Sequence, residues 1–577
     1  MLKKKPEEGG ARRTMRRTWL VWLFFIIVGI SNSFPGHAAV ELSNTGAEYA
    51  FGQVKSPPRP LQWRVLKSTH FEIYFYQGLE EVALRCQSIL DEAYDHVYPD
   101  FAGFFTINRL PPVRVILFAS RRDFQNAEAT GTPLTATPEG VAHFLIGRLA
   151  IICQPTLRDL RGVLVHEVTH IISLHPFRNR FLGGGGQPPD WLAEGLAEYY
   201  TPDLSRFPMR EGALRDAVFR DGLSTMDQLR SVGGNLDYAQ AWALTDFIAK
   251  KYGNGKLAEL LKEFFINGDR DITYQKVLGL SRQELWEAWR ADLQERYQAG
   301  REAPRITDYY SPWIAGYGQQ MQASPAGEGR VVFLSSHESR YLDLYLWENG
   351  KTRRLTEQTV TAYTVSPDGK EILFISDVEG ENLLYRLEIA TGKITPFPLA
   401  LGNPVEVAWS PVGERLAVTV NTKGDTDIYL VNLEGEVLAR VTSGSTDEMS
   451  PFWAPDGQGL VYVAEHLGFD QLYIWDGKKS RQLTAASKHH REPVWGEDGK
   501  IYLTLGDKGY YQTAVVDPRA SAQEGGKAEV ISPFRETLLH PFPLPGGEIL
   551  STVYENGTYK IYCWRPPGNG EKEVTAE

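Results

Sequence analysis

The sequence His-Glu-Val-Thr-His, at residues 166–170, brings two imidazoles and a carboxylate within five positions. The surrounding segment 156–174 has apolar residues at intervals of three and four, which predicts a helix. On a helix, His166 and His170 lie one turn apart on one face, where both can bind a single Zn²⁺, and Glu167 lies beside the metal. Two nitrogen ligands and a carboxylate that takes a proton from water are what zinc-dependent hydrolysis requires. The alternative is that both histidines are ordinary, partly buried helix residues.

A second segment, residues 188–200, supplies a candidate third ligand. It reads Pro-Pro-Asp-Trp-Leu-Ala-Glu-Gly-Leu-Ala-Glu-Tyr-Tyr and predicts a new helix, with Asp190 as its cap and Glu194 near its first turn. Taken with the histidine pair, this string resembles the gluzincin peptidases, specifically the peptidase MA-like family, over about residues 68–298. The resemblance implies one Zn²⁺ per chain with three protein ligands, His166, His170 and Glu194.

The same resemblance assigns Glu167 as the general base of the reaction. A metzincin scheme is excluded because it requires Gly at 173 and His at 176, where this chain has Ser173 and Pro176. The Gly-x-Met-Glu-Asn string with which aminopeptidase-type relatives bind a free amino terminus is not seen in the sequence. The family implied is therefore a zinc metallopeptidase, and the sequence favours an endopeptidase over an aminopeptidase.

Two further side chains are candidates for the same site. Glu198 follows Glu194 by one helical turn, where it can accept a hydrogen bond from a ligand imidazole and fix its tautomer, or can be a solvated helix carboxylate. Tyr238, in Tyr-Ala-Gln-Ala, is similar to the Tyr-x-Lys-Gly site of aminopeptidase-type gluzincins, whose Tyr donates to the developing oxyanion. Gln240 and Ala241 depart from that pattern, so core packing of Tyr238 is an equal alternative.

Two segments near these residues carry weaker predictions. Residues 140–144 occupy the place where relatives offer an edge strand for pairing with substrate. The four glycines at 183–186 predict a loop near the cleft, either a lid or slack chain. Three other histidines are interpreted as structural or solvent-exposed residues and not as ligands: His70, His143 and His175.

The elements that must position these side chains divide into two domains. Residues 61–304 alternate short strands with helices and end in nearly continuous helix, which predicts an α+β fold, here expected to be a zincin-like metallopeptidase domain. Residues 305–577 are instead all β. Turns of the type Ser-Pro-Asp-Gly recur near 366, 410, 454 and 496, at intervals of 42–44, with weaker copies near 324 and 544.

Each of these turns precedes an apolar strand, and most repeats show a second strand further on. Six such units predict a six-bladed propeller, because one four-stranded sheet cannot bury both its faces but six around an axis can. The turn signature and the Arg-x-Leu-Thr endings resemble TolB-like propellers. The alternative is an open sandwich with chance turns.

The first 38 residues predict export from the cytosol. A basic stretch precedes an apolar run at 19–30, and small residues follow at 36–39, as in a cleaved signal peptide. An uncleaved membrane anchor at 19–30 is the alternative, and Arg16-Arg17 leaves the twin-arginine and Sec routes both open. Residues 39–60 are interpreted as a linker. The expected location is extracytoplasmic, whether secreted, periplasmic or at the cell surface.

Composition excludes several classes of function. The chain has 577 residues and a net charge of −11, and residues 18–577 carry 54 basic and 70 acidic side chains. Such an acidic chain is not expected to bind nucleic acid. The three cysteines, Cys86, Cys153 and Cys563, show no metal-binding spacing and cannot form a disulfide framework.

Together these observations predict an exported zinc metallopeptidase. It would hydrolyse protein or peptide amide bonds with water activated by zinc and with Glu167 as base, while the propeller binds substrate or a protein or glycan partner. A membrane contact is expected only through an uncleaved N-terminal segment. The alternative function is a secreted or surface propeller scaffold whose metal domain is catalytically inert.

Overall fold

The computed structural model describes residues 61–567, apart from several short stretches at 105–109, 127–139, 144–145, 178–187, 202–207, 315, 317, 328, 340, 378–380, 508 and 521–525. The predicted signal segment 1–38, the linker 39–60 and the glycine loop 183–186 therefore lie outside the described residues. Among the helices of the described part, none is both long and apolar enough to span a membrane.

The N-terminal domain begins with a five-stranded mixed sheet in the order β1-β2-β3-β5-β4. Its strands are Trp63–Lys67 (β1), Phe71–Tyr76 (β2), Val113–Phe118 (β3), Gly140–His143 (β4) and Arg148–Ile152 (β5). Strands β2, β3 and β5 are parallel, whereas β1 and β4 run antiparallel to their neighbours and form the two edges. Fully buried runs such as Val-Ile-Leu-Phe in β3 place this sheet in the main core.

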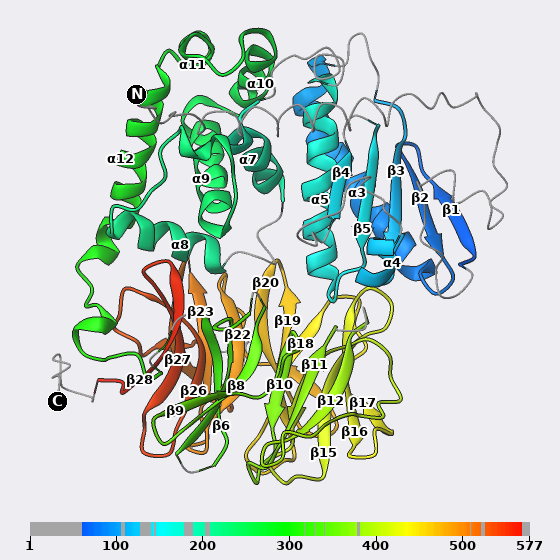
Figure 1. Ribbon diagram of the computed structural model, residues 1–577, viewed down its shortest axis with the longest axis vertical. Helices are drawn as coiled ribbons and strands as arrows, with labels where there is room; N and C mark the ends of the chain where they lie inside the picture. The colour runs from blue at the N-terminus through cyan, green and yellow to red at the C-terminus, as the bar shows by residue number, and fades with distance from the viewer. Residues whose placement is uncertain are drawn as a thin grey trace, which may run out of the picture.

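Helices pack on the sheet and continue beyond it as an all-helical half. They are Glu80–Phe101 (α3), Arg121–Asn126 (α4), Leu157–Leu174 (α5), Asp190–Tyr200 (α7), Pro208–Phe219 (α8), Asn235–Tyr252 (α9), Gly255–Asn267 (α10), Asp271–Leu278 (α11) and Arg282–Arg301 (α12). In Figure 1 the sheet with α3 and α5 forms one side of the domain, and α7 to α12 form the other. A capping box formed by Ser281 and Glu284 begins α12.

The C-terminal domain consists of six antiparallel sheets around an axis, which confirms the predicted six-bladed propeller. Blades 1 to 3 are Gln320–Pro325 (β6), Arg330–Ser335 (β7), Asp343–Glu348 (β8) and Lys351–Arg354 (β9); Ala362–Val365 (β10), Glu371–Ser376 (β11), Leu383–Glu388 (β12) and Ile394–Pro396 (β13); and Pro404–Trp409 (β14), Arg415–Asn421 (β15), Thr426–Asn432 (β16) and Val437–Arg440 (β17).

Blades 4 to 6 are Glu448–Trp453 (β18), Leu460–His466 (β19), Phe469–Trp475 (β20) and Ser480–Gln482 (β21); His489–Trp495 (β22), Ile501–Asp507 (β23), Tyr510–Val516 (β24) and Glu529–Val530 (β25); and Thr537–Pro543 (β26), Ile549–Glu555 (β27) and Thr558–Trp564 (β28). The outer edge of β28 is covered by the chain entering the propeller, where the N–H of Trp313 donates to the carbonyl of Ile561 at 2.8 Å. This contact closes the ring between its first and last blades.

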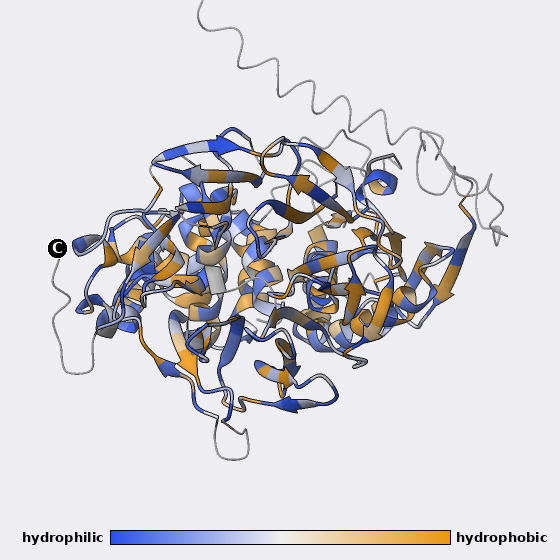
Figure 2. Cartoon of the chain, turned by 90° about the horizontal axis from the view of Figure 1, so that it is seen from below, coloured by the Kyte–Doolittle hydropathy of each residue, from blue (hydrophilic) through white to orange (hydrophobic). Residues whose placement is uncertain are grey.

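The repeated turns connect the innermost strand of each blade to the next strand. The final glycine of every predicted turn has positive φ, for example +66° at Gly369 and +68° at Gly457, a conformation that other residues rarely adopt. Apolar side chains of neighbouring blades share buried clusters, so each blade covers the face of the next. Figure 2 shows hydrophobic and hydrophilic residues alternating along many of these strands.

Candidate metal centre

Helix α5 carries the two histidines on the face opposite its apolar contacts with the core. Thr156 caps the helix, because its side-chain oxygen accepts from the N–H of Asp159 at 3.0 Å. Leu164 and Val168 are fully buried in the domain core, which fixes the rotation of the helix about its axis. His166 and His170, in contrast, are partly accessible, with about 12% and 11% of each side chain exposed.

The structure brings His166, His170 and Glu194 together. Nε2 of His166 lies 3.1 Å from Nε2 of His170. Oε2 of Glu194 lies 3.4 Å from the first of these nitrogens and 3.3 Å from the second. Within the described part of the chain, these three residues are the one group of His, Cys, Asp and Glu side chains arranged to hold a metal ion.

The spacing of these three atoms fits zinc. Ligands at 2.0–2.1 Å from a tetrahedral ion lie about 3.3–3.4 Å apart, which is close to the three observed separations. Two imidazole nitrogens and one carboxylate oxygen are also ligands that Zn²⁺ prefers, and three protein ligands leave one position open, as in catalytic sites. The residues present therefore suit this metal.

Glu194 reaches the histidines because helix α7 packs against both α5 and α9. A Cβ at Gly195 would lie 2.5 Å from the carbonyl oxygen of Ala241 and still nearer to Oγ1 of Thr245, so only glycine permits this approach. The predicted cap of α7 is wrong. Pro189 is the N-cap residue, and Asp190 is the first helical residue, with its carboxylate bonded to the backbone of Val232.

Glu198 lies one turn further along α7, behind the imidazole of His166. Its Oε1 is 3.1 Å from Nδ1 of His166, a contact with the length of a hydrogen bond but not the angle of one. Its Oε2 is 3.1 Å from Nη1 of Arg210, whose guanidinium stacks on the ring of Trp242 at 4.2 Å. Glu198 is thus buried between the histidine and a cation and is not a solvated carboxylate. Arg210 belongs to no motif, so the sequence did not indicate it.

Glu167 points from α5 toward the edge strand β4. A Cβ at Gly140 would lie 3.1 Å from Cγ of Glu167, which shows how closely the strand crosses the helix. Burial raises the pKa of Glu167, while the two histidines and a hydrogen bond from the backbone of Ala142 act in the opposite direction. The carboxyl group is therefore a stronger base than an exposed glutamate, as a proton acceptor near neutral pH should be.

Carboxylates dominate the electrostatics around the two imidazoles. Burial opposes protonation of His166, but Glu194 and Glu198 outweigh it and raise the pKa of that imidazole to about 10. Burial likewise opposes ionisation of Glu194, but His170 and His166 outweigh it and lower the pKa of Glu194. A positive charge is therefore favoured between these side chains.

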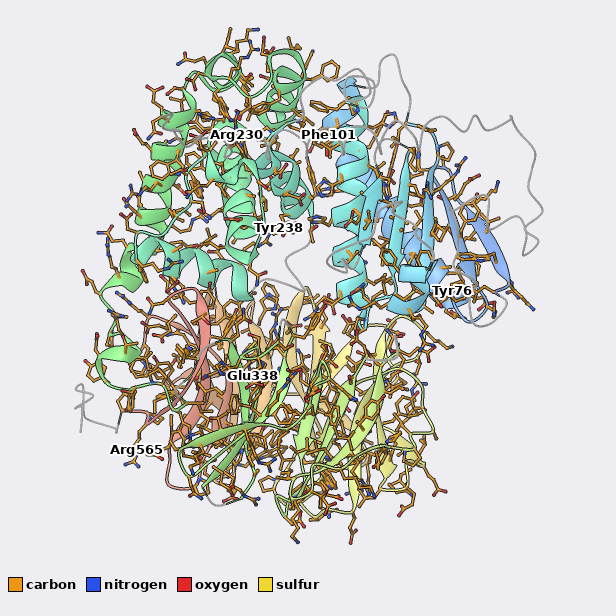
Figure 3. All side chains as sticks on the ribbon, viewed as in Figure 1. Tyr76, Phe101, Arg230, Tyr238, Glu338 and Arg565 are labelled. Atoms are coloured by element: carbon orange, nitrogen blue, oxygen red, sulfur yellow. The ribbon has the colours of Figure 1, made fainter. Side chains whose placement is uncertain are left out.

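Tyr238, which is labelled in Figure 3, lies in the first turn of α9, and its ring is close to that of His166 on α5. Its ring centroid is 6.4 Å from that of His166. Burial, and then the charges of Glu194 and Glu198, raise the pKa of Tyr238, which keeps the phenol protonated and able to donate. The side chain thus lies at the candidate site, and it is half-buried.

The remaining sequence predictions concern histidines and the edge strand. His70 stacks on Tyr94 with ring centroids 3.9 Å apart, His175 is buried, and His143 is half-buried in β4. None of them belongs to the group of potential ligands in the described residues. Strand β4 is an edge strand, since it pairs only with β5 in the described sheet.

The comparisons with known proteins concern the propeller. Residues 400–560 match the family model of the TolB beta propeller domain. The C-terminal domain is a TolB-like six-bladed β-propeller. A TolB homolog from Chlorobium luteolum is 30% identical over 150 residues, which cover 25% of this chain and 34% of that protein. The Tol-Pal system protein TolB from Francisella tularensis subsp. mediasiatica is 30% identical over 154 residues, covering 26% and 35%.

The chain therefore spans about a third of the length of the curated relatives it matches. Among solved structures, a putative TolB from Agrobacterium tumefaciens is 24% identical, with 36% of this chain and 74% of that chain covered and a TM-score of 0.32. The propeller domain of the trilobed protease from Pyrococcus furiosus is 15% identical, with 45% and 97% covered and a TM-score of 0.32. Neither match extends to the whole chain.

Proposed function

We propose that this protein is an exported zinc metallopeptidase with a TolB-like propeller. One observation carries the proposal: His166, His170 and Glu194 present three ligand atoms 3.1–3.4 Å apart, the spacing of a tetrahedral zinc site. Glu167 is adjacent to His166 in the sequence and lies half-buried against β4, which suits the role of a general base. The combination suits hydrolysis of an amide bond better than a purely structural metal site.

In this mechanism zinc, when bound, supplies a Lewis acid that lowers the pKa of water and polarises the scissile carbonyl. Glu167 accepts a proton from the attacking water and passes it to the leaving amine. The phenolic O–H of Tyr238 donates a hydrogen bond to the oxygen on which negative charge develops. Glu198 holds the imidazole of His166 in orientation through the contact at Nδ1.

The fold around these residues supports a zincin-like metallopeptidase domain. Helix α5, which carries both histidines, packs against a mixed sheet whose edge strand is β4. This strand runs antiparallel to β5 and passes close to Glu167. An extended peptide bound along β4 would add a strand to the sheet and bring its backbone over the candidate base. Such binding needs no free terminus, which agrees with endopeptidase action.

The propeller would bind substrate or a protein or glycan partner. Its similarity to TolB proteins, one of them named for the Tol-Pal system, supports a role in protein interaction and an extracytoplasmic location. The basic and apolar character of residues 1–38 supports export, with either cleavage or retention of residues 19–30 as an anchor.

The test uses purified residues 39–577 and the variant Glu167→Gln. We expect about one zinc per chain in both proteins, measured by elemental analysis, and cleavage of a peptide library by the wild type alone. The variant should lose 10²-fold or more in kcat, since it keeps the ligands but lacks the base. Equal residual cleavage by both proteins would mean a contaminating protease.

The second candidate function is a binding scaffold with an inert metal domain, favoured by the match of residues 400–560 to a propeller family. It predicts that zinc binds at one per chain and that no member of the library is cut by the wild type. Cleavage that depends on Glu167 would exclude this function.

A further inference from the structure

The propeller contacts the N-terminal end of the helix that carries the two histidines. One carboxylate oxygen of Asp447 accepts from the N–H of Leu157 at 3.0 Å, and the other accepts from the N–H of Arg158 at 2.9 Å. Asp447 immediately precedes β18 of blade 4 and is 6% exposed. A residue 290 positions away in the sequence thus satisfies two of the free N–H groups at the start of α5.

Asp447 is itself held rigidly by the propeller. Its Oδ1 accepts from the backbone N–H of Thr426 at 3.2 Å, and the hydroxyl of Thr426 lies 3.3 Å from the same oxygen. The carboxylate therefore joins β16 of blade 3 to the first turn of α5. A carboxylate at this end of a helix also interacts favourably with the helix dipole.

A buried ion cluster holds the same turn of α5 to blade 4. Arg158 pairs with Asp470, which also binds Arg491 and lies 3.1 Å from Nδ1 of His489. The side chain of Asp470 is fully buried, and that of Arg158 is 9% exposed. Just before the helix, Nδ2 of Asn421 donates to the carbonyl of Pro155 at 2.8 Å. The start of α5 is therefore held to blades 3 and 4 by these three sets of contacts.

The half of the domain that supplies Glu194 rests on different blades. Arg215 of α8 donates to the carbonyl of Gly509 at 3.2 Å and to Oγ1 of Thr537 at 2.9 Å, in blades 5 and 6. The carboxylate of Asp216 accepts from two backbone N–H groups of blade 6, at 2.9 and 3.0 Å. Helix α8 packs on α9, and α9 packs on α7, which carries Glu194. Figure 1 shows both halves standing on the same face of the propeller.

We propose that the propeller is the platform that aligns the two halves of the metal centre, with Asp447 as the positioning residue for α5. This inference rests on the proposed zinc function. Because a helix transmits displacement along its length, a shift at Leu157 moves both histidines relative to Glu194. Separations of 3.1–3.4 Å among three ligand atoms leave little tolerance for such a shift.

The experiment compares four variants of the mature chain. Asp447→Ala removes the acceptor for both N–H groups, and Asp447→Asn keeps one oxygen. Arg158→Met removes the ion pair to Asp470, whose charge still has Arg491 as partner. Arg85→Ala is the matched control, because it breaks another contact with the propeller, the 2.6 Å pair with Asp425, without touching the first turn of α5.

Three quantities are measured for each folded variant: zinc affinity by competition with a chromophoric chelator, the visible absorption spectrum of the Co²⁺-loaded protein, and kcat and KM for a peptide cut by the wild type. We expect Asp447→Ala to bind zinc at least tenfold more weakly, to change the cobalt bands, and to lower kcat more than it changes KM. Asp447→Asn should restore part of each loss, and Arg85→Ala should match the wild type.

The inference is overturned if Asp447→Ala is folded and keeps the zinc affinity and cobalt spectrum of the wild type, even with a lower melting temperature. If Asp447→Ala does not fold, the same criterion of unchanged zinc affinity and cobalt spectrum is applied to Arg158→Met. A wild type that binds zinc but cuts no peptide would contradict the proposed activity and leave the affinity and spectroscopic test decisive. A wild type that binds no zinc would overturn both proposals.

Discussion

Nδ1 of His166 lies 3.1 Å from Oε1 of Glu198, while Nε2 of the same ring faces Glu194 at 3.4 Å. One imidazole is therefore held between two carboxylates that are one turn apart on α7. The carboxylate of Glu198 is also paired with Arg210, so its position does not depend on the histidine alone. The contact with Nδ1 makes Glu198 a candidate positioning residue for the imidazole of His166.

Glu198→Gln should weaken zinc binding by about 10–100-fold, the usual cost of losing the partner of a metal-binding imidazole. Glu287→Gln, an exposed position on α12, serves as the control and should leave affinity unchanged. Chelator competition at fixed pH measures both. Wild-type affinity in Glu198→Gln would show that this carboxylate matters only to folding.

Tyr238→Phe separates the two interpretations of that residue. If the phenol stabilises the developing oxyanion, kcat falls by about 10–10³-fold, with zinc content and KM nearly unchanged, because the interaction forms only in the transition state. If the ring serves only packing, kcat is retained, since phenylalanine fills the same space. Steady-state kinetics on one peptide, with zinc content measured in parallel, decides between them.

Gly195→Ala should disturb the contact between α7 and α9. The added methyl group would meet the backbone carbonyl of Ala241 at 2.5 Å, which cannot move aside as a side chain could. We expect a loss of about 1–3 kcal/mol in the free energy of unfolding together with weaker zinc binding. Gly255→Ala, at the start of α10 with open space around its Cα, should be neutral or slightly stabilising. Denaturant unfolding of both variants provides the comparison, and equal stabilities would contradict the packing argument.

The sequence predicted the parts of the structure that depend on local spacing. The six blades could be predicted because the turn recurs with a period of 42–44 residues and each copy marks one blade. The glycine is retained in each copy because the turn needs a residue at positive φ before the next strand. The four-residue intervals in α5 and α7 placed the ligand candidates on helix faces. The zinc site and the peptidase activity stay predictions.

The sequence did not predict the contacts between distant segments. Nothing near Asp447 marks it as a partner of α5, because that role arises only when the two domains dock. Arg210 likewise gains its role only where α7, α8 and α9 meet. The assignment of Asp190 as a helix cap failed because the preceding Pro189 is extended, with φ −64° and ψ 147°, and takes the cap position itself.

Glu448, next to Asp447, should make stability depend on pH. Burial, reinforced by the charge of Asp427, raises the pKa of Glu448 to about 7. In the unfolded chain a glutamate has a pKa of about 4.3, so between these values the folded state binds more protons than the unfolded state. The free energy of unfolding should therefore fall as the pH rises from about 4.3 through 7. The stabilisation that comes from the protonated Glu448 is fully lost above pH 7.

Glu448→Gln stays neutral throughout that range and should remove this part of the pH dependence. At pH 8 we expect the variant to be more stable than the wild type by on the order of 2 kcal/mol, with the difference shrinking toward zero near pH 4. Glu434→Gln, an exposed position in blade 3, is the control and should follow the wild-type curve. Urea unfolding at several pH values tests this, and parallel curves for Glu448→Gln and the wild type would show that the carboxyl group is ionised in the folded protein at neutral pH.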